Sequence, residues 1–112
     1  EDTLQRVDAG EVDPKCLKCG GLMKRDVILF GEALVPQVIA GAMAAAEDAD
    51  LVMAIGTQLN VTPAANVVTR GKAAGAKVII MNNQPTDRDQ YADAFLMGDI
   101  TEMLPALVAI PD

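Results

Sequence analysis

Two cysteines carry the most distinctive chemistry of this chain. They form Cys16-x-x-Cys19 and are followed directly by Gly20-Gly21. At this spacing a tight turn can point two thiolates at one tetrahedral metal ion, while nearby amides and lysines stabilise their charge. A structural zinc site needs four ligands, and the chain has no other cysteine and no histidine. The pair therefore fits half of a zinc site, two reduced thiols or a disulfide. A thioredoxin-like redox motif is disfavoured, because that motif lies between a strand and a helix.

A second group of candidate residues follows an apolar run. Leu51–Ile55 is apolar throughout and is followed by Gly56, Thr57 and Gln58. A glycine at the carboxyl end of a parallel strand lets backbone amides approach a phosphate or ribose, and the helix start that follows favours negative charge. The pattern indicates a nucleotide site, although an ordinary strand-to-helix loop also accounts for Gly-Thr alone.

Alternating strands and helices must position these residues. Apolar and β-branched runs predict strands at residues 26–30, 51–55, 76–81 and 94–97, and the second run predicts the central parallel strand because it is apolar on both faces. Helical spacing predicts helices over residues 1–9, 36–48, 64–71 and 100–110. Thr62 and Pro63 should begin the third helix, and glycines should end it by Gly75. Pro105 fits the fourth helix only near its first turn. The alternation predicts an α/β fold with a parallel sheet.

Polar loops follow each expected strand. Gly31-Glu32, residues 82–87 and Gly98-Asp99 come directly after apolar runs. Because the carboxyl ends of parallel strands meet at one edge of a sheet, these loops should lie beside Gly56-Thr57. Taken alone, Glu32 is better explained as a solvated loop acid.

Composition narrows the classes of function. The 112 residues, 51% of them hydrophobic, can hold one small domain with a core, and 9 basic against 16 acidic residues give a net charge of −7. No basic stripe is available for nucleic acid or an anionic membrane. With neither a signal peptide nor an apolar run of about 18 residues, we expect a cytoplasmic protein. The lack of histidine removes any histidine base from this chain.

Together the motifs resemble the C-terminal part of the sirtuin (Sir2) family. The residues that carry the resemblance are Cys16-x-x-Cys19-Gly20-Gly21, Val27-Ile28-Leu29-Phe30-Gly31-Glu32, Gly56-Thr57-Gln58-Leu59-x-Val61-x-Pro63-Ala64, Ile80-Met81-Asn82 and Gly98-Asp99. The resemblance implies an NAD-dependent protein-lysine deacylase with a Rossmann-like, doubly wound, mostly parallel sheet and a zinc-ribbon insert. Residues 1–25 would be a remnant of that insert, and residues 26–112 would be the C-terminal half of the NAD-binding domain.

The resemblance also implies a role for individual residues. NAD would contact Gly56, Thr57 and Gln58 at the nicotinamide ribose and phosphates, Asn82 at the adenosine ribose, and Asp99 and Ile100 at adenine. An acyl-lysine side chain would contact Ile28 and Phe30. The substrate peptide would add as a strand between Gly31-Glu32 and Leu59–Val61. Cys16 and Cys19 would bind zinc.

The sequence departs from the family pattern in several places. It lacks the Gly-Ala-Gly-x-Ser phosphate loop, the Gln-Asn-x-Asp segment, the catalytic histidine and the first cysteine pair; Gln58 replaces a usual serine, and Arg25 a common proline. We therefore expect a C-terminal fragment that has no catalytic residue, is inactive alone, and forms a homo-oligomer or joins a complementary N-terminal half. The alternatives are a non-catalytic module that binds a nucleotide or a protein, and a structural fragment that binds no ligand.

Overall fold

The chain folds into two compact units. A computed structural model describes residues 2–109 and separates an N-terminal unit that ends at Ala33 from a sheet unit that begins at Leu34. The N-terminal unit contains α1 (Asp2–Asp8), which confirms the helix expected before Gly10, and an antiparallel bridge between Lys15 and Leu22. The division after residue 25 that the resemblance implies stays a prediction.

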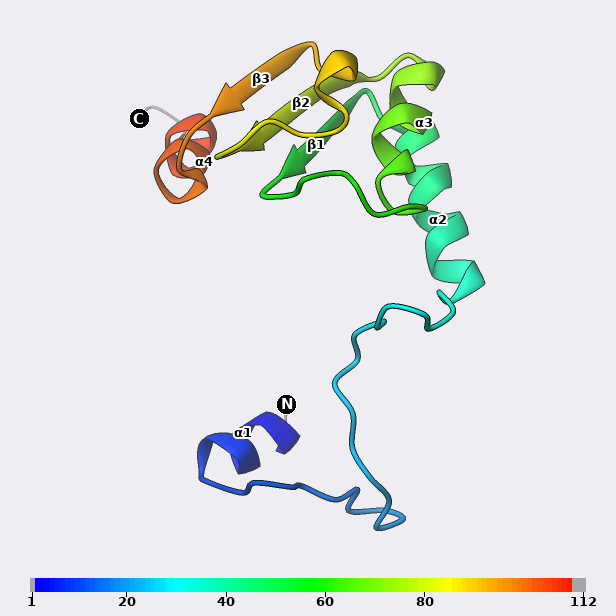
Figure 1. Ribbon diagram of the computed structural model, residues 1–112, viewed down its shortest axis with the longest axis vertical. Helices are drawn as coiled ribbons and strands as arrows, with labels where there is room; N and C mark the ends of the chain where they lie inside the picture. The colour runs from blue at the N-terminus through cyan, green and yellow to red at the C-terminus, as the bar shows by residue number, and fades with distance from the viewer. Residues whose placement is uncertain (1, 110–112) are drawn as a thin grey trace. The chain divides into compact units, whose positions relative to one another are not determined.

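The sheet unit is built on three parallel strands. Its elements are α2 (Pro36–Asp48), β1 (Leu51–Ile55), α3 (Asn66–Ala74), β2 (Lys77–Asn82), the 3₁₀ helix η1 (Asp89–Tyr91), β3 (Ala94–Met97) and α4 (Ile100–Val108). The strand order is β1-β2-β3, with Val52 opposite Val78 and Ile80 opposite Phe95. Figure 1 shows the three strands running in one direction, with α4 near their carboxyl ends. The expected α/β class is confirmed.

The core lies between α3 and the sheet. Val68 of α3 packs against Ala54 of β1 and against Val78 and Ile80 of β2. Val78 and Ile80 are fully buried, because α3 covers their face of the sheet and β2 has a neighbouring strand on each side. The left-handed conformation of Gly75 (φ 104°) ends α3, as the glycine there predicts. Within residues 2–109 no helix is long and apolar enough to cross a membrane.

The strand expected at residues 26–30 is not formed. Val27, Leu29 and Phe30 are 55%, 60% and 93% exposed, and the segment pairs with no strand in the described part of the chain. A β-branched run expresses only a propensity, and a strand also needs a partner for its hydrogen bonds. Three strands therefore form the sheet instead of the four expected.

Two further predictions about β1 and α3 are wrong. β1 lies at an edge of the described sheet and is not central. The prediction failed because an apolar run shows that both faces of a strand need cover, but does not show which strands lie beside it. Thr62 does not cap α3, which begins at Asn66 after Ala65. Residues 62–65 form turns instead, in which the Ala65 amide donates to the Val61 carbonyl at 3.0 Å.

The last helix agrees with its prediction only in part. α4 begins at Ile100 as expected and ends at Val108, while Ile110 lies outside the described residues. Pro105 lies inside α4, beyond the first turn, whereas the sequence predicted that a proline would fit only within that turn. Its carbonyl accepts a hydrogen bond from Ala109 at 3.0 Å, so the helix continues to bond after the proline.

Candidate functional site

A cavity opens at the carboxyl ends of the strands. It has a volume of about 570 Å³ and is lined by Gly56, Asn82, Asn83, Gly98, Asp99 and Ile100. Two backbone hydrogen bonds hold the strand ends together: Gly56 N donates to Met81 O at 2.9 Å, and Gly98 N donates to Asn82 O at 3.1 Å. The loops after all three strands therefore contribute to one cavity, as the parallel topology predicts.

Gly56 is required by the shape of this cavity. Its φ of +66° lies in the left-handed region, and a Cβ atom there would lie 3.2 Å from Ile100 Cδ1. Side chains strain that backbone conformation. The glycine therefore lets β1 turn sharply beside α4 and leaves the backbone accessible to a ligand.

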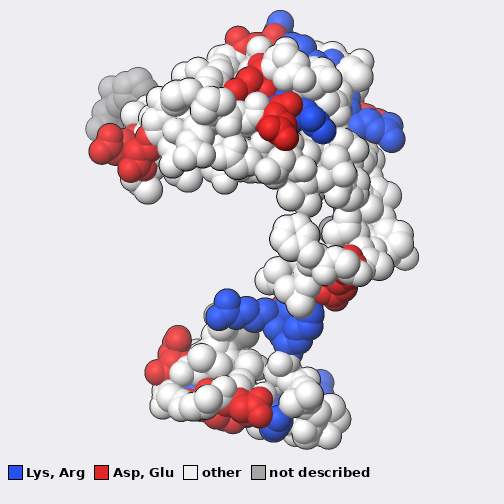
Figure 2. All heavy atoms as spheres, in the orientation of Figure 1, with Lys and Arg blue, Asp and Glu red and all other residues white. Residues whose placement is uncertain are grey.

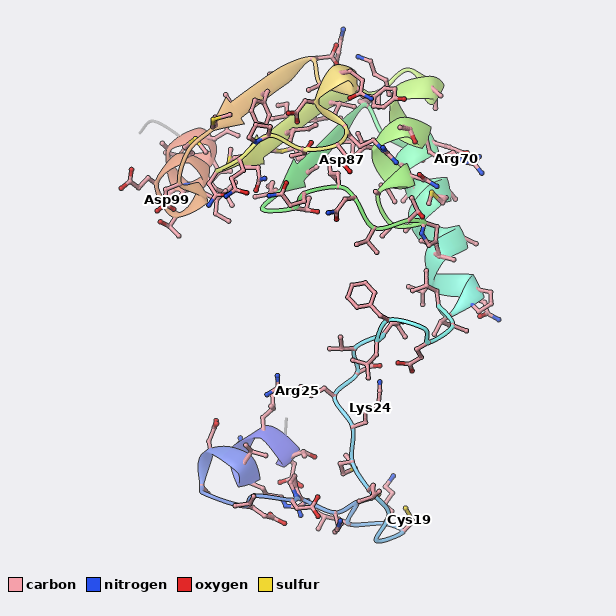
Figure 3. All side chains as sticks on the ribbon, viewed as in Figure 1. Cys19, Lys24, Arg25, Arg70, Asp87 and Asp99 are labelled. Carbon is pink, nitrogen blue, oxygen red and sulfur yellow. The ribbon has the colours of Figure 1, made fainter. Side chains whose placement is uncertain are left out.

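Asp99 forms the start of α4 at the edge of the cavity. Its Oδ1 accepts hydrogen bonds from Thr101 N at 2.8 Å and from Thr101 Oγ1 at 2.6 Å, and these bonds, the hydroxyl first, lower the pKa of Asp99. The carboxylate is therefore ionised at neutral pH. Figure 3 shows Asp99 beside α4, and Figure 2 shows acidic atoms at that end of the sheet unit. No lysine or arginine is among the residues that line the cavity. Its walls therefore suit the hydroxyl groups and the nucleobase of a ligand better than free phosphates.

Asn82 and two glutamines join the loops that follow β1 and β2. Asn82 is 5% exposed, and its Nδ2 donates to the Gln84 carbonyl at 2.9 Å. Gln58 Nε2 donates to Gln84 Oε1 at 2.9 Å, and Asp87 N donates to Gln58 O at 3.1 Å. The loop after β1 is therefore tied to the loop after β2.

Thr57, Leu59 and Val61 lie around a second cavity along β1. This cavity has a volume of about 400 Å³ and is lined mostly by apolar residues of β1, α3 and the loop between them. Leu59 has a φ of +54°, its side chain is buried in the core, and its amide donates to Thr57 Oγ1 at 3.2 Å. Only the backbone of Leu59 is thus available to a peptide, whereas Val61 is 51% exposed.

The residues predicted to contact NAD lie in three different places in the structure. Gly56, Asn82, Asp99 and Ile100 line the first cavity, Thr57 lines the second, and Gln58 bridges the two loops. Asn83 and Gly98 also line the first cavity, and Gln84 joins the loops, although none of the three was predicted to contact NAD. Their positions immediately after Asn82 and before Asp99 are the signal that could have identified them.

The other predicted substrate residues belong to the N-terminal unit. Phe30 is 93% exposed and Ile28 is 38% exposed, while Gly31 has a φ of +82°. Glu32 is not simply a solvated acid, since its Oε2 accepts from Leu29 N at 2.9 Å and lies 3.4 Å from Lys24 Nζ. The Leu29 amide is the main reason that the pKa of Glu32 is lowered.

The cysteine pair lies in a closed turn. Cys16 N donates to Gly21 O at 2.9 Å, and Gly20 N donates to Cys16 O at 2.8 Å. The pKa of Cys16 is lowered chiefly by backbone hydrogen bonds from Cys19 and Lys18. A turn with two thiols and amides aimed at sulfur fits two of the four ligands of a structural zinc ion. Among residues 2–109 no three cysteine, aspartate or glutamate side chains are grouped to hold a metal.

Comparison with known proteins decides the family. A sequence profile of the Sir2 family matches residues 1–63, more than half of the chain. The chain belongs to the Sir2 family. It is 40% identical over 107 residues to NAD-dependent protein deacetylase 2 of Streptomyces coelicolor, covering 96% of this chain and 44% of that protein. The predicted resemblance to the C-terminal part of a sirtuin is confirmed.

Solved structures give the same result for the fold. A Sir2 enzyme bound to a myristoylated histone peptide superposes with a TM-score of 0.80 at 38% identity, covering 96% of this chain and 45% of that one. A structure described as Sir2 with a p53 peptide and NAD⁺ gives a TM-score of 0.75 at 25% identity, covering 93% and 43%. The Rossmann-like sirtuin fold is thus confirmed, and this sirtuin chain spans less than half the length of its relatives.

Proposed function

We propose that this chain forms the C-terminal part of an NAD-dependent protein-lysine deacylase. The observation that carries the proposal is the cavity at the strand ends, which is lined by four of the six residues predicted to contact NAD, namely Gly56, Asn82, Asp99 and Ile100. The names of the relatives support it, because they are NAD-dependent protein deacetylases and deacylases. Residues 26–112 would then be half of an NAD-binding domain.

Each residue has a role that its position allows. When bound, NAD would supply the ribose that the acyl oxygen attacks and nicotinamide as the leaving group. Asn82, held by its bond to Gln84, would orient the adenosine ribose, and Asp99 and Ile100 would flank adenine. Gly56 would admit the cofactor close to the backbone, with Thr57 and Gln58 towards the nicotinamide ribose and phosphates.

Nucleotide titration of the full chain tests this assignment. We expect NAD and ADP-ribose to shift the amide NMR signals of residues 56, 82–83 and 98–100. Ile100→Ala should weaken these shifts, whereas Leu104→Ala, which shortens a side chain of the same helix outside the cavity, should leave them unchanged. Shifts confined to other residues would contradict the proposed site.

We further propose that the chain alone does not turn over. It contains no histidine and so has no imidazole to accept a proton from the ribose. Each charge-assisted hydrogen bond that the pyrophosphate lacks forfeits about 1.5–3 kcal/mol, so NAD should bind far more weakly than to a complete sirtuin. Nicotinamide release from NAD with an acetyl-lysine peptide should not exceed the protein-free control. A low-micromolar dissociation constant for NAD would contradict the expected loss of hydrogen bonds to the pyrophosphate. Nucleotide binding without deacylation by any assembly would favour a non-catalytic module.

The partner that we propose is an acyl-lysine peptide. Structures of related Sir2 enzymes contain acetylated and myristoylated peptides, and the exposed Phe30 and Ile28 offer apolar surface to an acyl chain. In the sheet unit, the backbone of Leu59–Val61 would pair with the peptide. Cys16 and Cys19 would supply half of a structural zinc site, and residues 1–25 would be the remnant of the zinc ribbon. A cytoplasmic location remains a prediction.

The exposed edge of β1 supports association with another chain. Leu51 and Met53 are 47% and 36% exposed, and β1 has a strand on only one side in the described residues. Unpaired strand edges and apolar surface favour pairing. We propose that a second copy or a complementary N-terminal half covers this edge. Sedimentation over a concentration series should show self-association, and a cooperatively unfolding monomer at high concentration would contradict it.

A further inference from the structure

Arg6 joins α1 to the cysteine turn through its whole guanidinium group. Its Nε and Nη2 donate to the two carboxylate oxygens of Glu11, both at 2.7 Å, and its Nη1 donates to the Lys15 carbonyl at 3.0 Å. Its side chain is 21% exposed, the least of the ion-paired cations in the described residues. Glu11 thus fixes the plane of the guanidinium, and the remaining nitrogen reaches the turn.

The carbonyl that Arg6 binds belongs to the peptide group that leads into Cys16. The peptide bond is planar, so fixing the Lys15 carbonyl also fixes the direction of the Cys16 N–H. That N–H donates to Gly21 O at 2.9 Å and closes the turn. Arg6 and Gly21 therefore hold the two ends of one rigid group, and the direction of the Cys16 side chain depends on its orientation.

We infer that Arg6 is a positioning residue for the metal-binding cysteine pair, holding the Lys15–Cys16 peptide so that both thiols face one metal ion. The inference rests on the proposed zinc site. Lysine cannot replace Arg6, because an ammonium group lacks the planar fork that binds a carboxylate through two nitrogens and a carbonyl through a third. Replacing residues that orient metal ligands typically lowers metal affinity about 10–100-fold.

Cobalt(II) titration of the full chain tests the inference, with thiolate-to-cobalt absorption as the readout. Arg6→Lys keeps the charge and should raise the dissociation constant about 10–100-fold. Arg25→Lys is the matched control: the same substitution in the same unit, at a side chain that Figure 3 shows apart from the Cys19 turn. It should leave the constant within about twofold, since Arg25 makes none of the contacts of Arg6.

Two further variants separate positioning from general stability. Glu11→Gln should weaken binding in the same direction, and its effect combined with Arg6→Lys should be smaller than the sum, because both break one set of contacts. Gln5→Gly, which weakens α1 at an exposed position, should keep the affinity. A loss with Gln5→Gly equal to that with Arg6→Lys would overturn the inference.

The remaining outcomes distinguish this inference from the zinc proposal. Cys16→Ser should abolish the absorption. Equal affinity of the unaltered chain and Arg6→Lys would overturn the role of Arg6 and leave the zinc site standing. Absence of thiolate absorption in the unaltered chain would overturn both.

Discussion

Replacing Gly71 with alanine should destabilise the sheet unit, although alanine is normally preferred inside a helix. Gly71 is a buried residue of α3. A Cβ atom there would lie 2.6 Å from Val52 Cγ2 and 3.2 Å from the Ala46 carbonyl oxygen. The first distance is far below van der Waals contact, and the second involves backbone that cannot rotate away. Gly71 therefore allows α3 to approach both β1 and α2.

Two opposing effects set the magnitude. Alanine in a helix interior is favoured over glycine by about 1 kcal/mol, whereas overpacking a well-packed core costs about 1–3 kcal/mol. Gly41 of α2 isolates the first effect, because a Cβ atom there would meet no atom within 4 Å. Gly41→Ala should stabilise the protein by up to about 1 kcal/mol. The two variants should therefore differ in free energy of unfolding by about 1–3 kcal/mol.

Thermal unfolding by circular dichroism at one protein concentration measures this difference. A change of 1 kcal/mol shifts Tm by roughly 4–8 °C in a domain of this size, so Gly71→Ala should melt several degrees below Gly41→Ala. Adding Val52→Ala to Gly71→Ala should recover part of the loss, since it removes the nearest atom. If Gly71→Ala raised Tm as much as Gly41→Ala, the close approach of α3 to β1 would be refuted.

Three other changes have expected outcomes. Ile80→Ala, at a fully buried position, should lower the free energy of unfolding by about 2–5 kcal/mol in urea titrations. Asp93 accepts hydrogen bonds from Lys72 Nζ and Val78 N, both at 2.8 Å. These bonds, the one from the lysine first, hold the pKa of Asp93 below the usual aspartate value. Its contribution should therefore be present at neutral pH and disappear as pH falls below about 4, so the stabilities of the unaltered chain and Asp93→Asn should converge in acid and not in alkali. Gly56→Ala should lower stability by about 1–2 kcal/mol through its left-handed backbone and weaken nucleotide-induced NMR shifts, and unchanged shifts would remove Gly56 from the site.

Much of the sheet unit could be predicted from local patterns. The runs that became β1, β2 and β3 are apolar, and glycine or a polar residue follows each one, so both the strands and the shared edge of their loops could be predicted. Gly75 has the position of a glycine that ends a helix, and its φ of 104° confirms that function. These features depend on residues close together in sequence, which is why the pattern sufficed.

Features that depend on distant partners could not be predicted. Gly71 and Gly75 look alike in sequence, yet Gly71 is needed because Val52 and Ala46 approach it. The contact of Gln58 with Gln84 joins residues 26 positions apart, and no periodicity reveals it. The bond from Arg6 to the Lys15 carbonyl spans nine positions and uses a backbone acceptor, so the residue types alone give no sign of it.

β1 and β2 show how one pattern can have two structural outcomes. Both are short apolar runs, but in β2 three of the largest side chains, Val78, Ile80 and Met81, are fully buried, whereas Leu51 and Met53 of β1 are substantially exposed. The difference lies in what covers each face. Val78 and Ile80 share a face with Val52 and Ala54 that packs against α3. Leu51 and Met53 lie on the opposite face, and β1 has a strand on only one side in the described part of the chain. At about 25 cal/mol per Å² of apolar surface, cover over β1 and the adjoining cavity would stabilise whatever provides it. The apolar run of β1 therefore encodes a partner surface, and this is the physical reason to expect association at this edge of the sheet.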